Sequence, residues 1–197
     1  MTEVELVALA EQAYRAEGGM PHITFLSSMA MDNPTGCVPA QNPSSRPLQL
    51  GDVIITEFSA WGYSGQLHRS IFVDVEPAPD WQHLFDAALA AYQGLVEAVR
   101  TGAAAADAIR DAGFTIYDDL LHGYGIDTLP PLIDRERFED PTAAEGSRFE
   151  RNMAVVLQPN PITPDDRMGL QLGALTIVTD AGAESLHRVP LEPLVAA

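Results

Sequence analysis

The sequence predicts an α+β fold, and three features carry this prediction. Residues 51–73 hold two apolar, β-branched runs separated by a glycine-containing turn, which is the pattern of two joined strands. Residues 81–100 repeat large apolar side chains at helical spacing. Two later apolar runs, 153–157 and 170–178, predict further strands. Helices and strands therefore both contribute to the core.

The first third of the chain predicts a helix, a strand and a loop. Thr2 and Glu5 have the spacing of a capping box, and Gly18-Gly19 ends the apolar helical face that follows. Residues 22–27 predict a short strand. Pro, Asn, Ser and Gly dominate 32–47 without an apolar period, so this segment is expected to be a loop.

The second half predicts shorter elements. Thr101-Gly102 interrupts the long helix, and the Ala-rich stretch 103–111 predicts a short helix. Prolines and charges alternate through 129–147, which predicts a long surface loop that contains one turn of helix. Residues 186–189 predict a last short strand.

Length and charge restrict the function. A chain of 197 residues that is 46% hydrophobic is expected to form a single domain, 1–197. Its formal net charge of −17 repels phosphate groups and anionic lipid, so we expect no nucleic acid and no membrane as partner. Cys37 is the only cysteine and no signal-peptide pattern is present at the start, so a cytoplasmic location is expected.

Polar residues interrupt the apolar hairpin. Glu57 closes its first strand, while Gln66 and His68 lie two apart on the second strand and would share one face. Three hydrogen-bonding groups are thus expected at one end of an otherwise apolar hairpin, which marks this place as the candidate site.

Several motifs resemble the pita-bread superfamily of methionine aminopeptidase, aminopeptidase P and creatinase. They are Gly51-Asp52 before an apolar strand, Gly62-Tyr63, Arg69-Ser70-Ile71-Phe72, the creatinase-like Ala40-Gln41-Asn42-Pro43, and the closing stretch 177–186. The resemblance implies a pita-bread fold, in which helices cover one face of a curved antiparallel sheet. It also implies a homodimer, and we expect residues 1–197 to hold no counterpart of creatinase's N-terminal domain.

The resemblance predicts that no metal site exists. The five positions that hold two divalent ions in the metal-dependent branches correspond here to Glu57, Gln66, Tyr124, Gln158 and Gly173. Only Glu57 is anionic, and amides or a phenol are poor ligands for hard dications. We therefore expect no metal and no cofactor.

The same resemblance suggests catalytic roles. His68 lies where creatinase has a catalytic carboxylate and is expected to titrate near neutral pH as a general acid/base. Glu57 would orient His68 and raise its pKa, and Tyr124 could donate a hydrogen bond to an oxyanion. The alternatives are a hydrogen-bonded histidine without chemistry and a tyrosine that only fills space.

Uncharged amides suggest the ligand. Gln41, Gln66 and Gln158 suit a small polar molecule such as a neutral amide, a urea-like compound or a zwitterion. Each could also be an ordinary buried amide. His122 shares a strand face with Tyr124, and we expect it at the start of that strand, at the surface or behind the binding residues.

Two functions remain open. The chain could be a metal-independent hydrolase or lyase that cleaves a C–N bond of a small polar molecule. Alternatively, it could be a catalytically silent, peptidase-like domain that binds a ligand or a protein. A collapsed cavity filled by Tyr124 and Phe58 would favour the silent domain.

Overall fold

The computed structural model describes residues 1–61, 65–97, 103–125, 128–140 and 149–196. Four helices are found in these ranges: α1 (Glu3–Ala16), α2 (Pro79–Glu97), α3 (Ala103–Asp111) and α4 (Arg135–Glu139). The strands of the main sheet are β1 (Met20–Ala30), β2 (Asp52–Trp61), β3 (Gln66–Val73), β5 (Asp119–Tyr124), β6 (Thr128–Asp134), β7 (Ala154–Leu157), β9 (Leu172–Thr179), β10 (Gly182–Ser185) and β11 (Leu194–Ala196). A small second sheet pairs β4 (Thr115–Ile116) with β8 (Pro161–Ile162).

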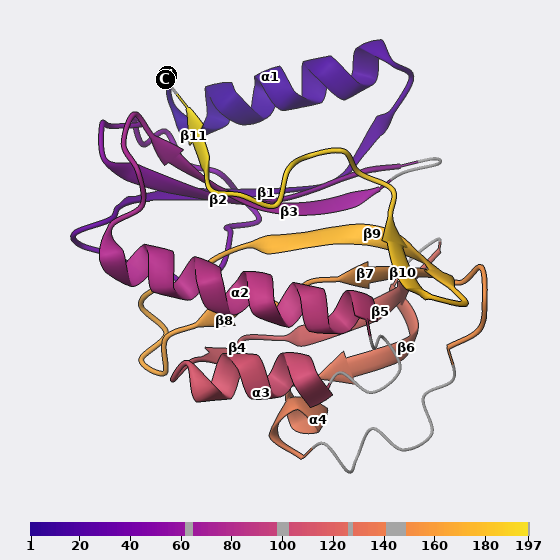
Figure 1. Cartoon of the computed structure of the whole chain (residues 1–197). Helices are drawn as coiled ribbons and strands as arrows, with labels where there is room; N and C mark the ends of the chain where they lie inside the picture. Colours follow the sequence, from indigo (N-terminus) through magenta and orange to yellow (C-terminus); the bar gives the residue numbers. More distant parts are fainter. Residues whose placement is uncertain (62–64, 98–102, 126–127, 141–148, 197) are drawn as a thin grey trace.

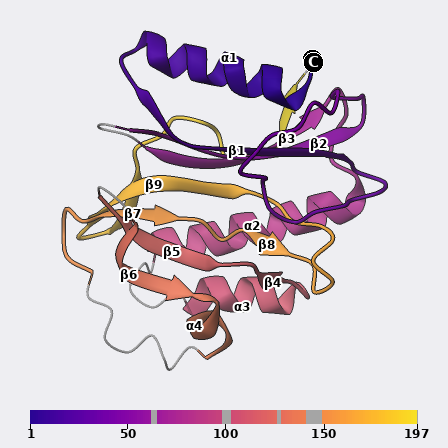
Figure 2. The same cartoon turned by 180° about the vertical axis from the view of Figure 1, so that it is seen from behind.

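The main sheet is curved and has the order β1-β2-β3-β9-β7-β5-β6, with β10 added to β9 and β11 to β3. Among the described pairings of named strands only that of β11 with β3 is parallel. Helix α1 lies along β1 to β3, and α2 and α3 lie along the second half of the sheet (Figure 1). The view from behind places α2 and α3 on the far side of the sheet (Figure 2). The predicted α+β fold, a curved antiparallel sheet with helices on one face, is confirmed.

The predicted helices α1 and α2 form for the expected reasons. Thr2 and Glu5 make the capping box at the start of α1, and Gly18 adopts a positive φ just beyond its end. Helix α2 buries Trp81, Leu84 and Leu95 completely or almost completely in the core. The Trp81 indole also donates a hydrogen bond to the carbonyl of Met31, which ties α2 to the segment after β1.

The hairpin β2–β3 supplies the floor of the candidate site. Its strands are antiparallel, and Glu57 lies directly opposite His68 while Ser59 lies opposite Gln66. Directly opposed residues point to the same face, so these four side chains share one face of the sheet. The connecting residues 62–64 lie outside the described part of the chain, so the Gly62-Tyr63 motif is not placed.

Two predictions for the second half are wrong. Residues 129–134 are not a loop, because β6 forms there, whereas α4 supplies the helical turn that was predicted within this segment. β6 is an edge strand that pairs with β5, and an edge position tolerates prolines because fewer amide protons are needed for pairing. Residues 186–189 are not a strand, and the C-terminal pairing is made by β10 and β11. Residues 101–102 and 141–148 lie outside the described ranges.

Across the described ranges, none of the helices combines the length and the apolar character needed to cross a membrane.

Candidate functional site

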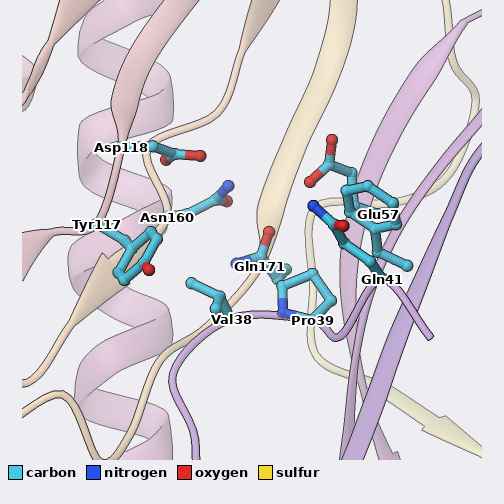
Figure 3. Close-up of a pocket in the computed structure, with 9 residues that line it drawn as sticks. Val38, Pro39, Gln41, Glu57, Tyr117, Asp118, Asn160 and Gln171 are labelled. Atoms are coloured by element: carbon cyan, nitrogen blue, oxygen red, sulfur yellow. The ribbon is translucent and has the colours of Figure 1, made fainter. Parts of the chain in front are cut away.

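A cavity of about 250 Å³ lies on the sheet face that α2 does not cover. Its walls come from five parts of the chain: β1, the segment between β1 and β2, β2 itself, the residues before β5, and the residues around β8 and β9. The lining residues are Phe25, Val38, Pro39, Gln41, Glu57, Tyr117, Asp118, Asn160 and Gln171 (Figure 3). The cavity is large enough for a molecule of amino-acid size and is not collapsed.

Glu57 is the main titratable group of the cavity. Burial raises the pKa of its carboxyl from the ordinary 4.5 to about 7, and the charge of Asp118 adds to this effect. A hydrogen bond from Gln66 Nε2 to Glu57 Oε1, 2.8 Å long, works in the opposite direction and orients the carboxyl. Glu57 can therefore both accept and release a proton near neutral pH.

Two further carboxyl groups stand near Glu57. The carboxyls of Asp118 and Glu57 point toward each other from opposite walls of the cavity (Figure 3). Behind Asp118, burial and the charges of Asp118 and Glu57 raise the pKa of Asp119 to about 8. Desolvation also raises the pKa of Asp118, but this residue is exposed and solvent screens its charge, so Glu57 is the stronger proton carrier.

A hydrogen-bond network lies beneath Glu57. Gln66 Nε2 is 2.8 Å from Glu57 Oε1, 3.0 Å from His68 Nε2 and 3.3 Å from Gln158 Oε1. Gln158 in turn donates to the carboxyl of Asp119. Gln66 and Gln158 are both buried, and their amide groups link the two carboxyls that have raised pKa values.

His68 is not the titrating group that the sequence predicts. Its side chain is completely buried, and this burial lowers its pKa to about 3, so the imidazole is neutral at physiological pH. Glu57 Oε2 is 4.0 Å from His68 Nδ1, beyond hydrogen-bond distance. The predictions that His68 titrates near neutral pH and that Glu57 raises its pKa are therefore wrong.

Neutral His68 instead orients the amides around it. Because Gln66 Nε2 donates to His68 Nε2, the proton of the ring is on Nδ1, which lies 3.1 Å from the acceptor Gln171 Oε1. The NH₂ group of Gln171 is then left at the cavity wall. Asn160, which also lines the cavity, accepts a hydrogen bond from the backbone amide of Leu172 through Oδ1, and its Nδ2 lies 3.3 Å from His68 Nδ1.

Tyr124 and His122 lie away from the cavity lining. The Tyr124 hydroxyl is 2.5 Å from Ser59 Oγ, and Ser59 is also 3.3 Å from His22 Nδ1. The oxyanion role of Tyr124 stays a prediction that this contact does not support. His122 lies inside β5 and is 3% exposed, so its predicted place at the strand start and surface is wrong. Its position behind the binding residues agrees with its electrostatic effect on His68.

The structure thus brings together Glu57, Gln66, His68 and Gln158, and places Gln41 in the cavity wall. Sequence reasoning missed four residues: Asp118, Asp119, Asn160 and Gln171. The available signals were the acidic pair Asp118-Asp119 at the start of the strand that holds His122, and the amide Gln171 directly before β9. Only the strand pairing shows that these segments meet.

The residues at the five family metal positions do not fit a pair of dications. Gln66 and Gln158 are engaged with each other, and the phenol of Tyr124 contacts Ser59. At Gly173 a Cβ atom would lie 2.6 Å from the backbone oxygen of Leu157, so no ligand side chain can stand there. Within the described ranges, no group of three or more His, Cys, Asp or Glu side chains could hold a metal ion.

Comparisons with known proteins place the chain in a family. The sequence model of Metallopeptidase family M24 matches residues 1–180. Similar solved structures include the dipeptidase PepE from Mycobacterium ulcerans, with a TM-score of 0.80 and 26% identity over 98% of this chain and 52% of that chain. A dipeptidase from Pyrococcus horikoshii OT3 has a TM-score of 0.80 and 21% identity over 100% of this chain and 55% of that chain.

A smaller relative has the same fold. Methionine aminopeptidase from Rickettsia prowazekii gives a TM-score of 0.72 and 15% identity over 94% of this chain and 85% of that chain. The chain spans about half the length of the two dipeptidases, 52% and 55%. The comparison with curated proteins gave no match. Because the family model covers most of the sequence and the fold agrees, this chain belongs to metallopeptidase family M24.

Proposed function

We propose that this chain is a metal-independent hydrolase that cleaves an amide C–N bond of a small polar molecule carrying a positively charged nitrogen. The observation that carries the proposal is the Glu57 carboxyl, which faces an open cavity and has a pKa of about 7. Membership of a peptidase family and the dipeptidase titles of two structural neighbours support hydrolysis of an amide.

The reaction needs only a water molecule and one proton carrier. Glu57 in its ionised form takes a proton from water, and the water oxygen attacks the carbonyl carbon. The proton then passes from Glu57 to the leaving nitrogen as the C–N bond breaks. The products are a carboxylic acid and an amine, and Glu57 returns to its ionised form.

The polar walls of the cavity match such a substrate. The NH₂ groups of Gln171 and Asn160 can donate hydrogen bonds to the carbonyl oxygen, where negative charge develops. The charged lining residues, Glu57 and Asp118, are both acidic. They favour a cationic nitrogen and disfavour an anion, and the effect is strongest beside the buried Glu57, because solvent screens the charge of the exposed Asp118.

Matched amides test the proposal. Glycinamide carries an ammonium group where propionamide carries a methyl group of similar size, so we expect the enzyme to bind and cleave glycinamide in preference. NMR follows its conversion to glycine and ammonium, and a reaction in ¹⁸O-water places the label in the new carboxyl group only if the bond is hydrolysed. Treatment with EDTA is expected to leave the rate unchanged.

Two variants assign the roles. Glu57→Gln is expected to reduce turnover by about a hundredfold or more, the usual effect of losing a general acid/base. Asp118→Asn is expected to weaken glycinamide binding more than propionamide binding. Glu11→Gln and Asp107→Asn make the same changes in exposed ion pairs of α1 and α3 and serve as controls. Equal rates of Glu57→Gln and wild type would reject the mechanism.

A catalytically silent binding domain is the alternative, and complete burial of the neutral His68 favours it, because this histidine cannot exchange protons with a ligand. Binding of glycinamide without any turnover, in NMR spectra that show the cavity residues shifting, would select this alternative. The open cavity is evidence against a collapsed, ligand-free site.

A further inference from the structure

The segment between β1 and β2, residues 31–51 and here called the cavity loop, forms one wall of the cavity. It contributes Val38, Pro39 and Gln41 to the lining. Figure 2 shows this segment in front of the sheet, on the side away from α2. The cavity loop has no helix or strand of its own that could hold it in this place.

A buried carboxylate at the start of α1 binds the cavity loop. Glu3 is 4% exposed, although it lies in the first turn of a surface helix. Its Oε2 accepts hydrogen bonds of 2.7 Å from both the amide and the hydroxyl of Ser44, a residue of the cavity loop. Its Oε1 accepts bonds of 2.6 and 2.7 Å from the amide and hydroxyl of Ser28 in β1.

The charge of Glu3 is retained at neutral pH. Burial alone would raise the pKa of its carboxyl, but the four hydrogen bonds from Ser28 and Ser44 outweigh burial and lower it. Four short bonds to one carboxylate are stronger than neutral hydrogen bonds. The Glu3 carboxylate therefore joins α1, β1 and the cavity loop, and backbone hydrogen bonds from Glu3 N to Arg46 O and from Val4 N to Ser44 O lie beside it.

Other contacts continue from this point to the cavity. Arg46 of the cavity loop makes a two-pronged ion pair of 2.6 and 2.8 Å with Asp52 and donates to Ser28 Oγ. Closer to the cavity, the amide of Ala40 donates to Ser27 Oγ at 2.7 Å. Ala40 lies between two lining residues, so the hold on Ser44 is transmitted over only a few residues of backbone.

We propose that Glu3 is a positioning residue, whose carboxylate holds the cavity loop in place as the wall over Glu57. Without the carboxylate only backbone hydrogen bonds and the Arg46–Asp52 ion pair would hold this part of the loop, so the loop would open more often and water would enter beside Glu57. Glu3 itself touches neither the cavity nor Glu57, so its effect on the cavity passes through the loop. This role rests on the proposed function, which makes the cavity the place of the reaction. It concerns how the wall of the cavity is held and not the reaction itself.

Glu3→Gln tests the proposal with little change in volume. A glutamine presents one oxygen and one NH₂ group, and the NH₂ group cannot accept from a backbone amide, so the bond from the amide of either Ser28 or Ser44 is lost. Ser44→Ala removes only the loop hydroxyl and is the milder variant. Glu11→Gln, on the same helix and in an exposed ion pair with Arg15, is the matched control.

Hydrogen exchange and the measured pKa of Glu57 are the readouts. In Glu3→Gln, amides of the cavity loop are expected to exchange roughly tenfold faster or more, while those of α2 keep the wild-type rate. The pKa of Glu57, followed by the ¹³C shift of its carboxyl, is expected to fall toward its ordinary value as water reaches it. Ser44→Ala should show the same local pattern at smaller size, and it decides the question if Glu3→Gln does not fold.

Unchanged exchange and an unchanged Glu57 pKa in the folded variants would overturn the proposal. Equal acceleration throughout the chain would also overturn it, because Glu3 would then only stabilise the fold. Neither readout involves a substrate. A chain that shows the local response but hydrolyses no amide would therefore reject the proposed function and leave the role of Glu3 standing.

Discussion

Replacing Glu57 by glutamine is expected to stabilise the protein at alkaline pH. The folded state raises the pKa of this carboxyl from 4.5 to about 7, so the folded protein holds the Glu57 proton over a pH range in which the unfolded chain has lost it. The ionised form is therefore disfavoured by folding. Stability must fall as pH rises from about 4.5, and the loss is complete above about pH 7.

The size of the effect follows from the difference between the two values. One pKa unit corresponds to about 1.36 kcal/mol, so the Glu57 carboxyl lowers the free energy of unfolding by roughly 3 kcal/mol at pH 8 and by less than about 1 kcal/mol at pH 5. The Glu57 side chain is 16% exposed, so solvent screening removes little of it. Glutamine keeps an oxygen that can accept the hydrogen bond from Gln66, so the local geometry is retained.

Urea denaturation of wild type and Glu57→Gln at pH 5, 6, 7 and 8 measures this difference. The free energy of unfolding of the variant should exceed that of wild type at pH 8, and the two should converge toward pH 5. The charge of Glu57 also helps to raise the pKa of Asp119, so the comparison measures the cost of ionising Glu57 together with its repulsion of Asp119. Glu11→Gln should show no such pH dependence. Equal stability at pH 8, or a gap that stays constant with pH, would refute the reasoning.

Three other predictions follow from the packing of the site. Gly173→Ala should lower the free energy of unfolding by about 1–3 kcal/mol in a urea titration, because its Cβ would lie 2.6 Å from the Leu157 oxygen; an unchanged midpoint would show that the strands can separate at low cost. Tyr124→Phe should lower the free energy of unfolding by about 1 kcal/mol, because it removes the hydrogen bond to Ser59. Unaltered turnover of glycinamide by this variant would exclude the predicted oxyanion role. Adding Mn²⁺, Co²⁺ or Zn²⁺ should leave Tm unchanged in a thermal scan, and the purified protein should not carry two equivalents of metal. A rise in Tm with metal concentration would contradict the conclusion that these side chains do not fit a pair of dications.

The local elements were predictable where the chain's own pattern decides them. The capping box places the start of α1, and the Ala-rich stretch 103–111 coincides with α3. The spacing of Gln66 and His68 correctly places both on one strand face, and antiparallel pairing then brings Glu57 opposite His68. These inferences depend on two neighbouring strands only.

The properties of the site depend on distant segments and could not be predicted. His68 is neutral because β9 and the amides of Gln171 and Asn160 enclose it, and these residues lie about a hundred positions away in the sequence. A histidine in a polar pattern looks titratable until the degree of burial is known. Asp118 was missed for a related reason, since only the curvature of the sheet brings it opposite Glu57.

The close contact at Gly173 also restricts how such a site can change during evolution. The resemblance places a metal ligand at this position in the metal-dependent branches, but here β9 lies so close to the end of β7 that a side chain would meet main-chain atoms. A single mutation back to glutamate would have to push two paired strands apart before it could gain a ligand. Sequences that descend from this one therefore face a barrier to regaining metal chemistry, and a designer who wishes to restore it must first rebuild the backbone.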